Sequence, residues 1–382
     1  MRIAIVGSGQ LARMMVLETR QLHANFVFLA LPGDATDSVA GLGDIVKIDA
    51  IPTSEGAFVD LYNALGKPDV ITVEKESVPV ALLEGLAQYC PLYPAADAIA
   101  VAQHRGKEKD LLNSLGIATP RYQVINRVED LAAGVAALGL PIIAKTLVGG
   151  YDGKGQWFLK TQDDLAPLLE AFPEMGIVLE EKVNFSREAS LIAARSVSGD
   201  IVFYPATENV HSDGILLTSV SPAQDLSAAE TATMEAAMRR LMEHWNYVGV
   251  LAIEFFITDQ GVLVNEIAPR VHNSGHWTMQ AGKASQFENH IRALMGKPLQ
   301  PFNADAAADN TGTVSGMVNI LGHYDLARQP ELEKTVPCEL HWYDKPPKPL
   351  RKTGHINFQH TDRDALLKNL EAVKAFVYQS ES

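Results

Sequence analysis

The N-terminal segment alternates short apolar runs with helical stretches, and this alternation constrains the fold more than any other feature of the sequence. The runs Ile3–Val6, Asn25–Ala30 and Asp69–Val73 have the length and composition of buried strands, and a glycine turn and a helical pattern follow the first. Strands that alternate with helices predict a parallel sheet with helices on its faces. We therefore expect an α/β protein whose first unit is a parallel α/β domain.

The turn after the first strand carries Gly7, Gly9 and Ala12, which fit the G-x-G-x-x-G/A pattern of dinucleotide-binding sheets. Such a site also needs an acidic residue at the end of the second strand to bind a ribose hydroxyl. The second strand ends at Leu31 with no carboxylate before Asp34, which argues against nicotinamide or flavin binding. Two interpretations stay open: an anion bound at the helix N-terminus, and close packing of the helix on the strand.

The rest of the chain predicts a mixed arrangement of strands and helices. A helix is expected over Ile99–Leu115, ended by Gly116. A capping box at Ser227 and Glu230 predicts the start of another helix. The small, polar segment Asn303–Asn310 is typical of a linker. The remaining expected elements are strands at Ile142–Lys145, Trp157–Lys160 and Ile177–Val183, a hairpin of Glu188–Arg195 with Ile201–Tyr204, strands at Val250–Ile257, Val262–Ile267, Val314–Ile320 and His355–Phe358, and a last helix from Asp364.

Two glutamates, Glu254 and Glu266, interrupt neighbouring apolar strands. If the chain turns at Gln260, each lies six residues from the turn and the two face each other. Like charges opposed on a sheet are destabilising, so the pair needs a cation, or one carboxyl must take up a proton. Carboxylates without His or Cys beside them suit Mg²⁺. The alternative is a different register in which one glutamate forms a structural ion pair with Arg270.

A nucleotide site is indicated where Lys145 ends an apolar strand and the glycine-rich loop Gly149–Trp157 follows. Backbone N–H groups of such a loop can surround phosphate oxygens, although the GKS or GKT of a Walker A motif is absent. We expect a flap that closes over a triphosphate, with a mobile hairpin as the alternative. After the next strand, Glu180–Val183 is expected to offer backbone groups to an adenine and Glu188 a carboxylate to ribose hydroxyls. A solvated strand end is the alternative.

The charge balance excludes one class of partner. The net charge of the 382 residues is −14, and polymeric nucleic acid needs a surplus of cations instead. Four cations near the C-terminus suit an anionic small molecule, with a solvated loop as the alternative. They are Lys345, Lys348, Arg351 and Lys352. Two cysteines, Cys90 and Cys338, are too few for a disulfide framework, and no signal peptide or membrane-length apolar run is visible, so we expect a soluble, cytoplasmic protein.

Several motifs resemble the 5-(carboxyamino)imidazole ribonucleotide synthase family of the ATP-grasp superfamily, in order along essentially the whole chain. They are GSGQLARM, GGYDGKGQW, EEKVNFSREASL, FYPATENVHSDGILLTS, NEIAPRVHNSGHWT, HWYDK and RKTGH. The resemblance implies an ATP-grasp architecture: a pre-ATP-grasp, Rossmann-like α/β domain at 1–98, an ATP-grasp α+β domain at 99–300 with a mobile flap at about 119–183, and a small β-rich domain at 301–382. It also implies a homodimer.

The family reaction joins ATP, bicarbonate and 5-aminoimidazole ribonucleotide through carboxyphosphate, in purine biosynthesis. By motif, the resemblance implies that Glu254 and Glu266 bind Mg²⁺ or Mn²⁺, and that Arg270, His272 and Asn273 bind bicarbonate or carboxyphosphate. The resemblance also implies that Lys145 is catalytic. The residues that it implies for ATP are Arg105, Lys145, Gly150, Tyr151, Asp152, Gly153, Lys154, Gly155, Gln156, Glu180, Glu181, Lys182, Val183, Glu188, His211, Asn265 and Glu266. Residues implied for the ribonucleotide are Glu74, Tyr151, Asp152, Lys345, Arg351 and Lys352.

The sequence departs from the family's motifs at three positions: Ala12 replaces a glycine, His104 an aspartate, and Lys154 an arginine. Ala268 stands where wider ATP-grasp enzymes often have asparagine, as suits this family. Three other functions are alternatives: another ATP-grasp ligase that forms an acyl phosphate for a different acceptor, a catalytically silent homologue, and a dehydrogenase. The HNSGHW and RKTGH motifs argue against the first, and the intact metal pair argues against the second.

Overall fold

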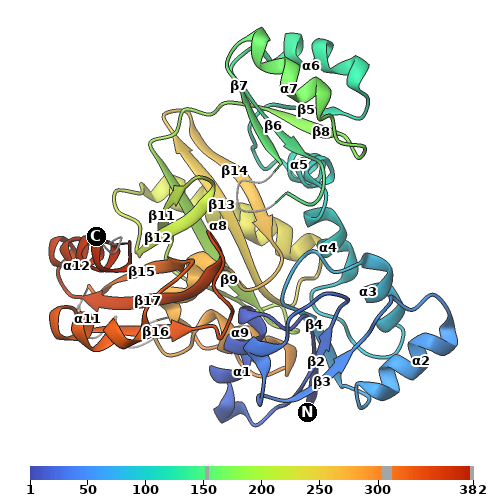
Figure 1. Cartoon of the computed structure of the whole chain (residues 1–382), viewed down its shortest axis with the longest axis vertical. Coiled ribbons are helices and arrows are strands. Elements are labelled where there is room, and N and C mark those ends of the chain that lie inside the picture. Colours follow the sequence, from blue (N-terminus) through green and yellow to red (C-terminus); the bar gives the residue numbers. More distant parts are fainter. Residues whose placement is uncertain (151–154, 303–311, 379–382) are drawn as a thin grey trace.

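The computed structural model describes residues 1–150, 155–302 and 312–378. Within these ranges the strands form three sheets. Figure 1 shows the N-terminal sheet in blue, the small sheet in green at the opposite end, and the large central sheet between them, with the C-terminal elements in red at its side. None of the helices in these ranges combines the length and apolar composition needed to cross a membrane.

The N-terminal sheet is parallel throughout, as predicted. Its strands are β3 (Asp44–Lys47), β2 (Asn25–Ala30), β1 (Arg2–Val6) and β4 (Val70–Val73), in that spatial order. The helices between and after them are α1 (Gln10–Leu17), α2 (Glu55–Ala64) and α3 (Val80–Leu86). The central strand β1 is buried from Ile3 to Val6, which matches its unbroken apolar composition.

The helix predicted over Ile99–Leu115 is wrong, because two helices occupy that segment: α4 (Ala96–Ala102) and α5 (Arg105–Ser114). The break falls at His104, whose backbone is extended and whose Nδ1 accepts the Lys107 N–H at 3.2 Å. His104 therefore caps the N-terminus of α5, a role for which the aspartate of the family's motif is typical. Gly116 follows α5 with φ +68, as the prediction of a helix end required.

The small sheet is antiparallel and carries the predicted flap. Its strands are β5 (Tyr122–Ile125), β8 (Ile177–Glu181), β6 (Ile142–Thr146) and β7 (Gln156–Leu159), in that order. Helices α6 (Leu131–Leu138) and α7 (Leu165–Glu170) supply Leu131, Val135 and Leu168 to the core of this unit. Strands β6 and β7 flank the glycine-rich segment, of which residues 151–154 lie outside the described residues.

The central sheet has nine strands within the part of the chain that the structure describes. In spatial order they are β14 (Gly261–Ala268), β13 (Gly249–Thr258), β9 (Arg187–Arg195), β11 (Thr207–Ser212), β12 (Ile215–Ser221), β15 (Val314–Leu321), β17 (Lys352–His360) and β16 (Cys338–Trp342), with β10 (Ile201–Phe203) paired to β9. The hairpin of β9 with β10 and the capping box of α8 (Ala228–His244) are both as predicted. Helices α8 and α9 (Gln286–Leu294) contact β13 and β9.

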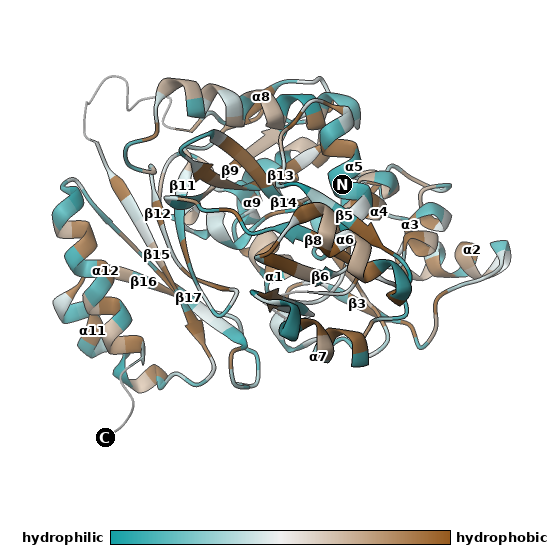
Figure 2. Cartoon of the chain, turned by 90° about the horizontal axis from the view of Figure 1, so that it is seen from above, coloured by the Kyte–Doolittle hydropathy of each residue, from teal (hydrophilic) through white to brown (hydrophobic). Residues whose placement is uncertain are grey.

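The predicted β-rich C-terminal unit is present, but its strands continue the central sheet. Strand β15 pairs with β12 of the ATP-grasp segment, with Ser219 opposite Met317. Helices α11 (Gln329–Thr335) and α12 (Arg363–Tyr378) lie along β15–β17, and Figure 2 shows both polar and apolar residues on each. The linker predicted at Asn303–Asn310 lies outside the described residues, and the domain boundaries stay predictions.

One hydrophobic cluster joins all three parts of the chain. It contains Met15 of α1, Phe287 of α9 and Tyr343, which follows β16. Nearby, the Ser38 hydroxyl donates to the Tyr343 carbonyl at 2.7 Å. Because the three parts share a core, side chains at their junction can form one site.

Candidate active site

The glutamates of the predicted metal pair face each other, since Glu254 is the register partner of Glu266 in the hairpin of β13 and β14. The alternative, in which one of them pairs with Arg270, is wrong because Arg270 forms its ion pair with Glu76. The predicted pairing of Glu254 with Glu266 is therefore confirmed.

The turn between β13 and β14 is not centred where the sequence predicted. Thr258 pairs with Gly261, so the turn is centred between two residues and not on Gln260. With this turn alone, Glu254 would lie opposite Asn265. A bulge next to Glu254 adds one residue to β14 and brings the second glutamate opposite the first.

The electrostatics of the pair favour a bound cation. Burial, and then the charge of Glu266, raise the pKa of Glu254 to about 7. Arg105 Nη1 lies 3.5 Å from a Glu266 oxygen, and the buried Asn265 Oδ1 has no hydrogen-bond partner. No group of three or more His, Cys, Asp or Glu suited to a metal occurs in the described ranges. Two carboxylates fit Mg²⁺ when phosphate oxygens complete its coordination.

Lys145 is held by a buried ion-pair cluster that joins the flap sheet to α5. Its Nζ donates to Glu180 Oε2 at 2.8 Å, and Lys109 Nζ lies 3.2 Å from the other oxygen of Glu180. Burial disfavours the Glu180 carboxylate, but the two lysines outweigh burial and lower its pKa to about 2. Glu180 therefore positions Lys145, whose ammonium keeps two further N–H donors for phosphate. Sequence reasoning missed Lys109.

The backbone at the end of β8 corrects part of the prediction that Glu180–Val183 binds an adenine. The N–H groups of Glu181 and Lys182 donate to the carbonyls of Arg121 and Pro141 at 2.9 and 3.2 Å, so neither is available to an adenine. Val183 is the first residue after the strand with no such backbone bond among those described, and it remains the candidate donor.

The predicted ribose partner Glu188 lies on β9 and bonds a residue of β11. Its Oε2 lies 2.8 Å from His211 Nδ1. Burial lowers the pKa of His211, but the bond to Glu188 and the charges of Glu254 and Glu266 outweigh burial and raise it. Because these charges act on His211, it lies near the metal pair together with Glu188, and the role of both residues in ATP binding stays a prediction.

Arg105 connects α5 to the start of the flap loop. It donates from Nη2 to the Gly150 carbonyl at 3.0 Å and from its backbone N–H to the Leu147 carbonyl at 2.9 Å. On the other side of the loop, the Gly155 carbonyl accepts the Thr146 N–H at 2.9 Å, and Gln156 opens β7. The other predicted loop residues lie outside the described residues. They are Tyr151, Asp152, Gly153 and Lys154.

The predicted oxyanion residues follow β14, and His272 is held in one tautomer. Its Nδ1 accepts the Ser274 N–H at 3.3 Å and lies 2.9 Å from the Ser274 hydroxyl, which itself accepts from Ser190. The ring proton is therefore assigned to Nε2, which lies 3.6 Å from a Glu254 oxygen. Burial, then the charges of Arg270 and Lys352, lower the pKa of His272 well below its usual range. In this neutral form His272 can donate a hydrogen bond from Nε2.

Asn273 is fixed by a residue that sequence reasoning missed. It exchanges two amide hydrogen bonds with Asn319 of β15, at 3.0 and 2.7 Å, and Asn319 also donates to the Leu216 carbonyl at 2.7 Å. Asn319 is fully buried. An amide inside an otherwise apolar strand was the signal that could have identified it.

The glycine turn of the N-terminal unit binds a carboxylate of the protein itself, the side chain of Glu74. Gly9 N–H and Ala12 N–H donate to the two oxygens of Glu74 at 2.5 and 3.0 Å. A Cβ at Gly7 would lie 2.3 Å from Glu74 Cγ, and the φ of Gly7 is +114. Both interpretations left open by the sequence therefore hold in part: the helix N-terminus carries a negative charge, and the glycines permit its close approach.

Gly9→Ala tests this arrangement. A Cβ there would lie 2.8 Å from Glu74 Oε1, while the φ of Gly9, −94, is open to alanine. We expect a loss of about 1–3 kcal/mol in the free energy of unfolding because the carboxylate must move. Gly56→Ala, where nothing lies within 4 Å, is the matched control and should not destabilise. Equal urea midpoints for the Gly9→Ala variant and the wild type would contradict the crowding.

The predicted cations near the C-terminus lie close to the glycine turn of the N-terminal unit. Lys345 Nζ donates to Gln10 Oε1, and burial lowers the pKa of Lys345 to about 8, although Glu74 opposes this. The charges of Arg351 and Lys352 also act on Lys345. Lys352 further acts on Glu76, Glu254 and His272, so it lies near the metal pair as well. The predicted ribonucleotide residues that the structure describes are thus brought together.

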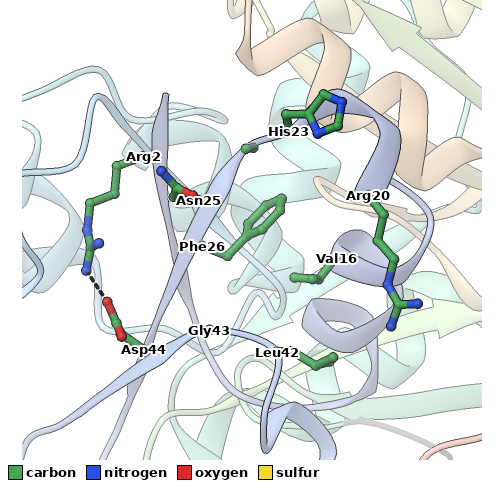
Figure 3. Close-up of a pocket in the computed structure, with 10 residues that line it drawn as sticks. Arg2, Val16, Arg20, His23, Asn25, Phe26, Leu42, Gly43 and Asp44 are labelled. Atoms are coloured by element: carbon green, nitrogen blue, oxygen red, sulfur yellow. Dashed lines mark hydrogen bonds and ion pairs between the residues drawn. The ribbon is translucent and has the colours of Figure 1, made fainter.

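A separate cavity lies on the N-terminal sheet, away from these residues. It has a volume of about 530 Å³, and Figure 3 shows Phe26 and the ion pair of Arg2 with Asp44 in its lining. None of the predicted site residues lines it.

Comparison with known protein families gives three consecutive matches. Residues 1–103 match the ribonucleotide synthetase preATP-grasp domain, residues 110–287 the ATP-grasp domain, and residues 315–369 the phosphoribosylaminoimidazole carboxylase C-terminal domain.

Whole-chain relatives agree with this order. The chain is 42% identical over 369 residues to the N5-carboxyaminoimidazole ribonucleotide synthase of Vibrio cholerae, covering 94% of this chain and 90% of that one. The crystal structure of the synthetase from Thermus thermophilus superposes with a TM-score of 0.87 at 37% identity, covering 100% and 99% of the two chains. That of the Staphylococcus aureus synthetase complexed with ADP gives 0.84 at 31% identity, covering 97% and 96%.

Proposed function

The chain belongs to the family of N5-carboxyaminoimidazole ribonucleotide synthases, ATP-dependent ligases of purine biosynthesis, and we propose on that premise how its residues carry out the carboxylation. The reaction transfers the γ-phosphoryl group of ATP to bicarbonate, which gives ADP and carboxyphosphate. The exocyclic amine of 5-aminoimidazole ribonucleotide then takes up the carboxyl group, and phosphate leaves. Carbon dioxide released from carboxyphosphate, or its equivalent, is the species that the amine attacks.

The observation that carries this proposal is the position of the Arg270–Asn273 loop. It begins two residues after β14, and its His272 Nε2 lies 3.6 Å from an oxygen of Glu254, the partner of Glu266 in the metal pair. Lys352 acts electrostatically on both Glu254 and His272. The polar sites proposed for the phosphoryl donor ATP, the small oxyanion bicarbonate and the phosphorylated acceptor are therefore adjacent to one another.

Mg²⁺, with Mn²⁺ as the alternative, is proposed to bind Glu254 and Glu266 together with ATP phosphates. When bound, it neutralises charge on the transferring phosphoryl group. Lys145 and Arg105 add positive charge on the protein side. His272 donates from Nε2, and Arg270 offers a guanidinium that suits the bidentate recognition of a carboxylate or phosphate.

ATP hydrolysis measured with and without bicarbonate and 5-aminoimidazole ribonucleotide tests the proposed function. We expect phosphate release to depend on bicarbonate and to rise when the ribonucleotide is added. Turnover that neither compound changes would contradict the proposal. A homodimer and a cytoplasmic location also remain proposals, which the mass in solution and cell fractionation would test.

Lys352→Ala tests the ribonucleotide site. We expect the KM for 5-aminoimidazole ribonucleotide to rise by roughly tenfold or more, because a cation paired with the 5-phosphate is lost. The KM for ATP should stay within about twofold, since Lys145 and Arg105 remain. Lys368→Ala, an exposed lysine on α12, is the control. Equal rises in both constants would argue against the phosphate-binding role.

A further inference from the structure

Arg270 forms a bidentate ion pair with a carboxylate from another part of the chain. Its Nε and Nη2 donate to the two oxygens of Glu76, the second at 3.0 Å, and its Nη1 donates to the Val271 carbonyl at 3.0 Å. Glu76 lies three residues after β4, in the N-terminal unit, so this pair joins that unit to the loop after β14. No motif or spacing in the sequence predicted this pair.

The hydrogen bonds leave a defined part of Arg270 unused. A guanidinium has five N–H groups in a fixed plane. Glu76 takes two of them and Val271 takes one. Among the described residues, the two that remain are one N–H on each terminal nitrogen. These two N–H groups, one on Nη1 and one on Nη2, are donors for the oxygens of a carboxylate or carboxyphosphate.

We propose that Glu76 is a positioning residue that fixes the plane of the Arg270 guanidinium, so that the two remaining N–H groups bind bicarbonate and then carboxyphosphate. This inference rests on the proposed function. Glu76 would act through Arg270 and would not touch the reacting atoms. Its role would also make the oxyanion site depend on docking of the N-terminal unit.

The surroundings of Glu76 support an ionised carboxylate. The Arg270 and Lys352 charges more than offset burial and lower the pKa of Glu76. The side chain of Arg270 is 16% exposed and that of Glu76 37% exposed, so the pair is partly accessible to solvent. A purely structural ion pair between two units is the competing explanation, and kinetics can separate the two.

The test compares Glu76→Gln with the wild type in degassed buffer at varied bicarbonate. We expect the KM for bicarbonate to rise by roughly ten- to hundredfold, while the KM for ATP changes by less than about twofold. Glu84→Gln, an exposed glutamate on α3, is the matched control and should change neither. A Glu76→Gln variant with a lowered melting temperature but an unchanged KM for bicarbonate would overturn the proposal in favour of the structural ion pair.

A double-mutant cycle with Arg270→Lys shows whether Glu76 acts through the arginine. Lysine cannot form the planar fork, so adding Glu76→Gln to that variant should change the KM for bicarbonate by less than about twofold. An equal rise in both backgrounds would overturn the proposal. If Glu76→Gln does not fold, Glu76→Asp, which keeps the charge but shortens the reach, should show an intermediate rise. A wild type without bicarbonate-dependent ATP hydrolysis would instead refute the proposed function.

Discussion

Glu266→Gln is expected to abolish bicarbonate-dependent ATP hydrolysis, lowering kcat by about three orders of magnitude, because a bound metal supplies several kcal/mol of charge stabilisation. Gln keeps the size and position of the side chain opposite Glu254 but removes one of two carboxylates. It should also weaken Mg²⁺ binding in the presence of ADP, which calorimetry measures without turnover.

The same hairpin offers a control for this variant. Asp259→Asn also removes one negative charge, but in the exposed turn between β13 and β14. It should leave kcat within about twofold, since a lone surface charge contributes little. Near-normal turnover by the Glu266→Gln variant would rule out the metal assignment.

Glu180→Gln is expected to lower the free energy of unfolding by about 3–5 kcal/mol, because it leaves two buried lysines without their shared carboxylate. The atoms concerned are Lys145 Nζ, at 2.8 Å, and Lys109 Nζ, at 3.2 Å. Lys145 would also lose its fixed position, so ATP turnover should fall. Urea unfolding followed by circular dichroism measures the first effect. Glu181→Gln, which breaks a partly exposed pair with Arg121, should cost less than about 1 kcal/mol.

This cluster also sets a pH dependence. The folded pKa of Glu180 is about 2 against an ordinary value of 4.5, so the folded protein holds the ionised form more tightly. Its stabilisation is complete above pH 4.5 and is lost as the pH falls from 4.5 to 2. The stability difference between wild type and Glu180→Gln should therefore shrink over that range. A constant difference would contradict the ion-pair explanation.

The sequence predicted those parts of the fold and site that depend on local pattern. The parallel N-terminal sheet follows from its apolar strands, and the opposed Glu254 and Glu266 follow from two acids in one apolar hairpin. Even there the turn was misplaced, and a bulge at Asn265 compensated for the error. A one-residue insertion in a strand leaves no periodic signal, so it could not be read from the residues alone.

Contacts between segments that are far apart in the chain could not be predicted from the sequence. The pairs of Arg270 with Glu76 and of Asn273 with Asn319 join residues that are 194 and 46 positions apart. The acceptor of the glycine turn, Glu74, is likewise 65 residues from Gly9. Each partner is chosen by how whole units dock, and no local spacing encodes that choice.

The shared central sheet makes the C-terminal unit unsuitable as an exchangeable module. Since β15 pairs with β12, removing it would expose the backbone N–H and carbonyl groups of β12 as a new sheet edge, a template for pairing with other chains. Deletion or recombination at this junction would therefore produce a protein prone to aggregation. The same cut would remove Asn319 and leave the Asn273 amide without its partner. Truncation at this junction is therefore expected to lower solubility as well as activity.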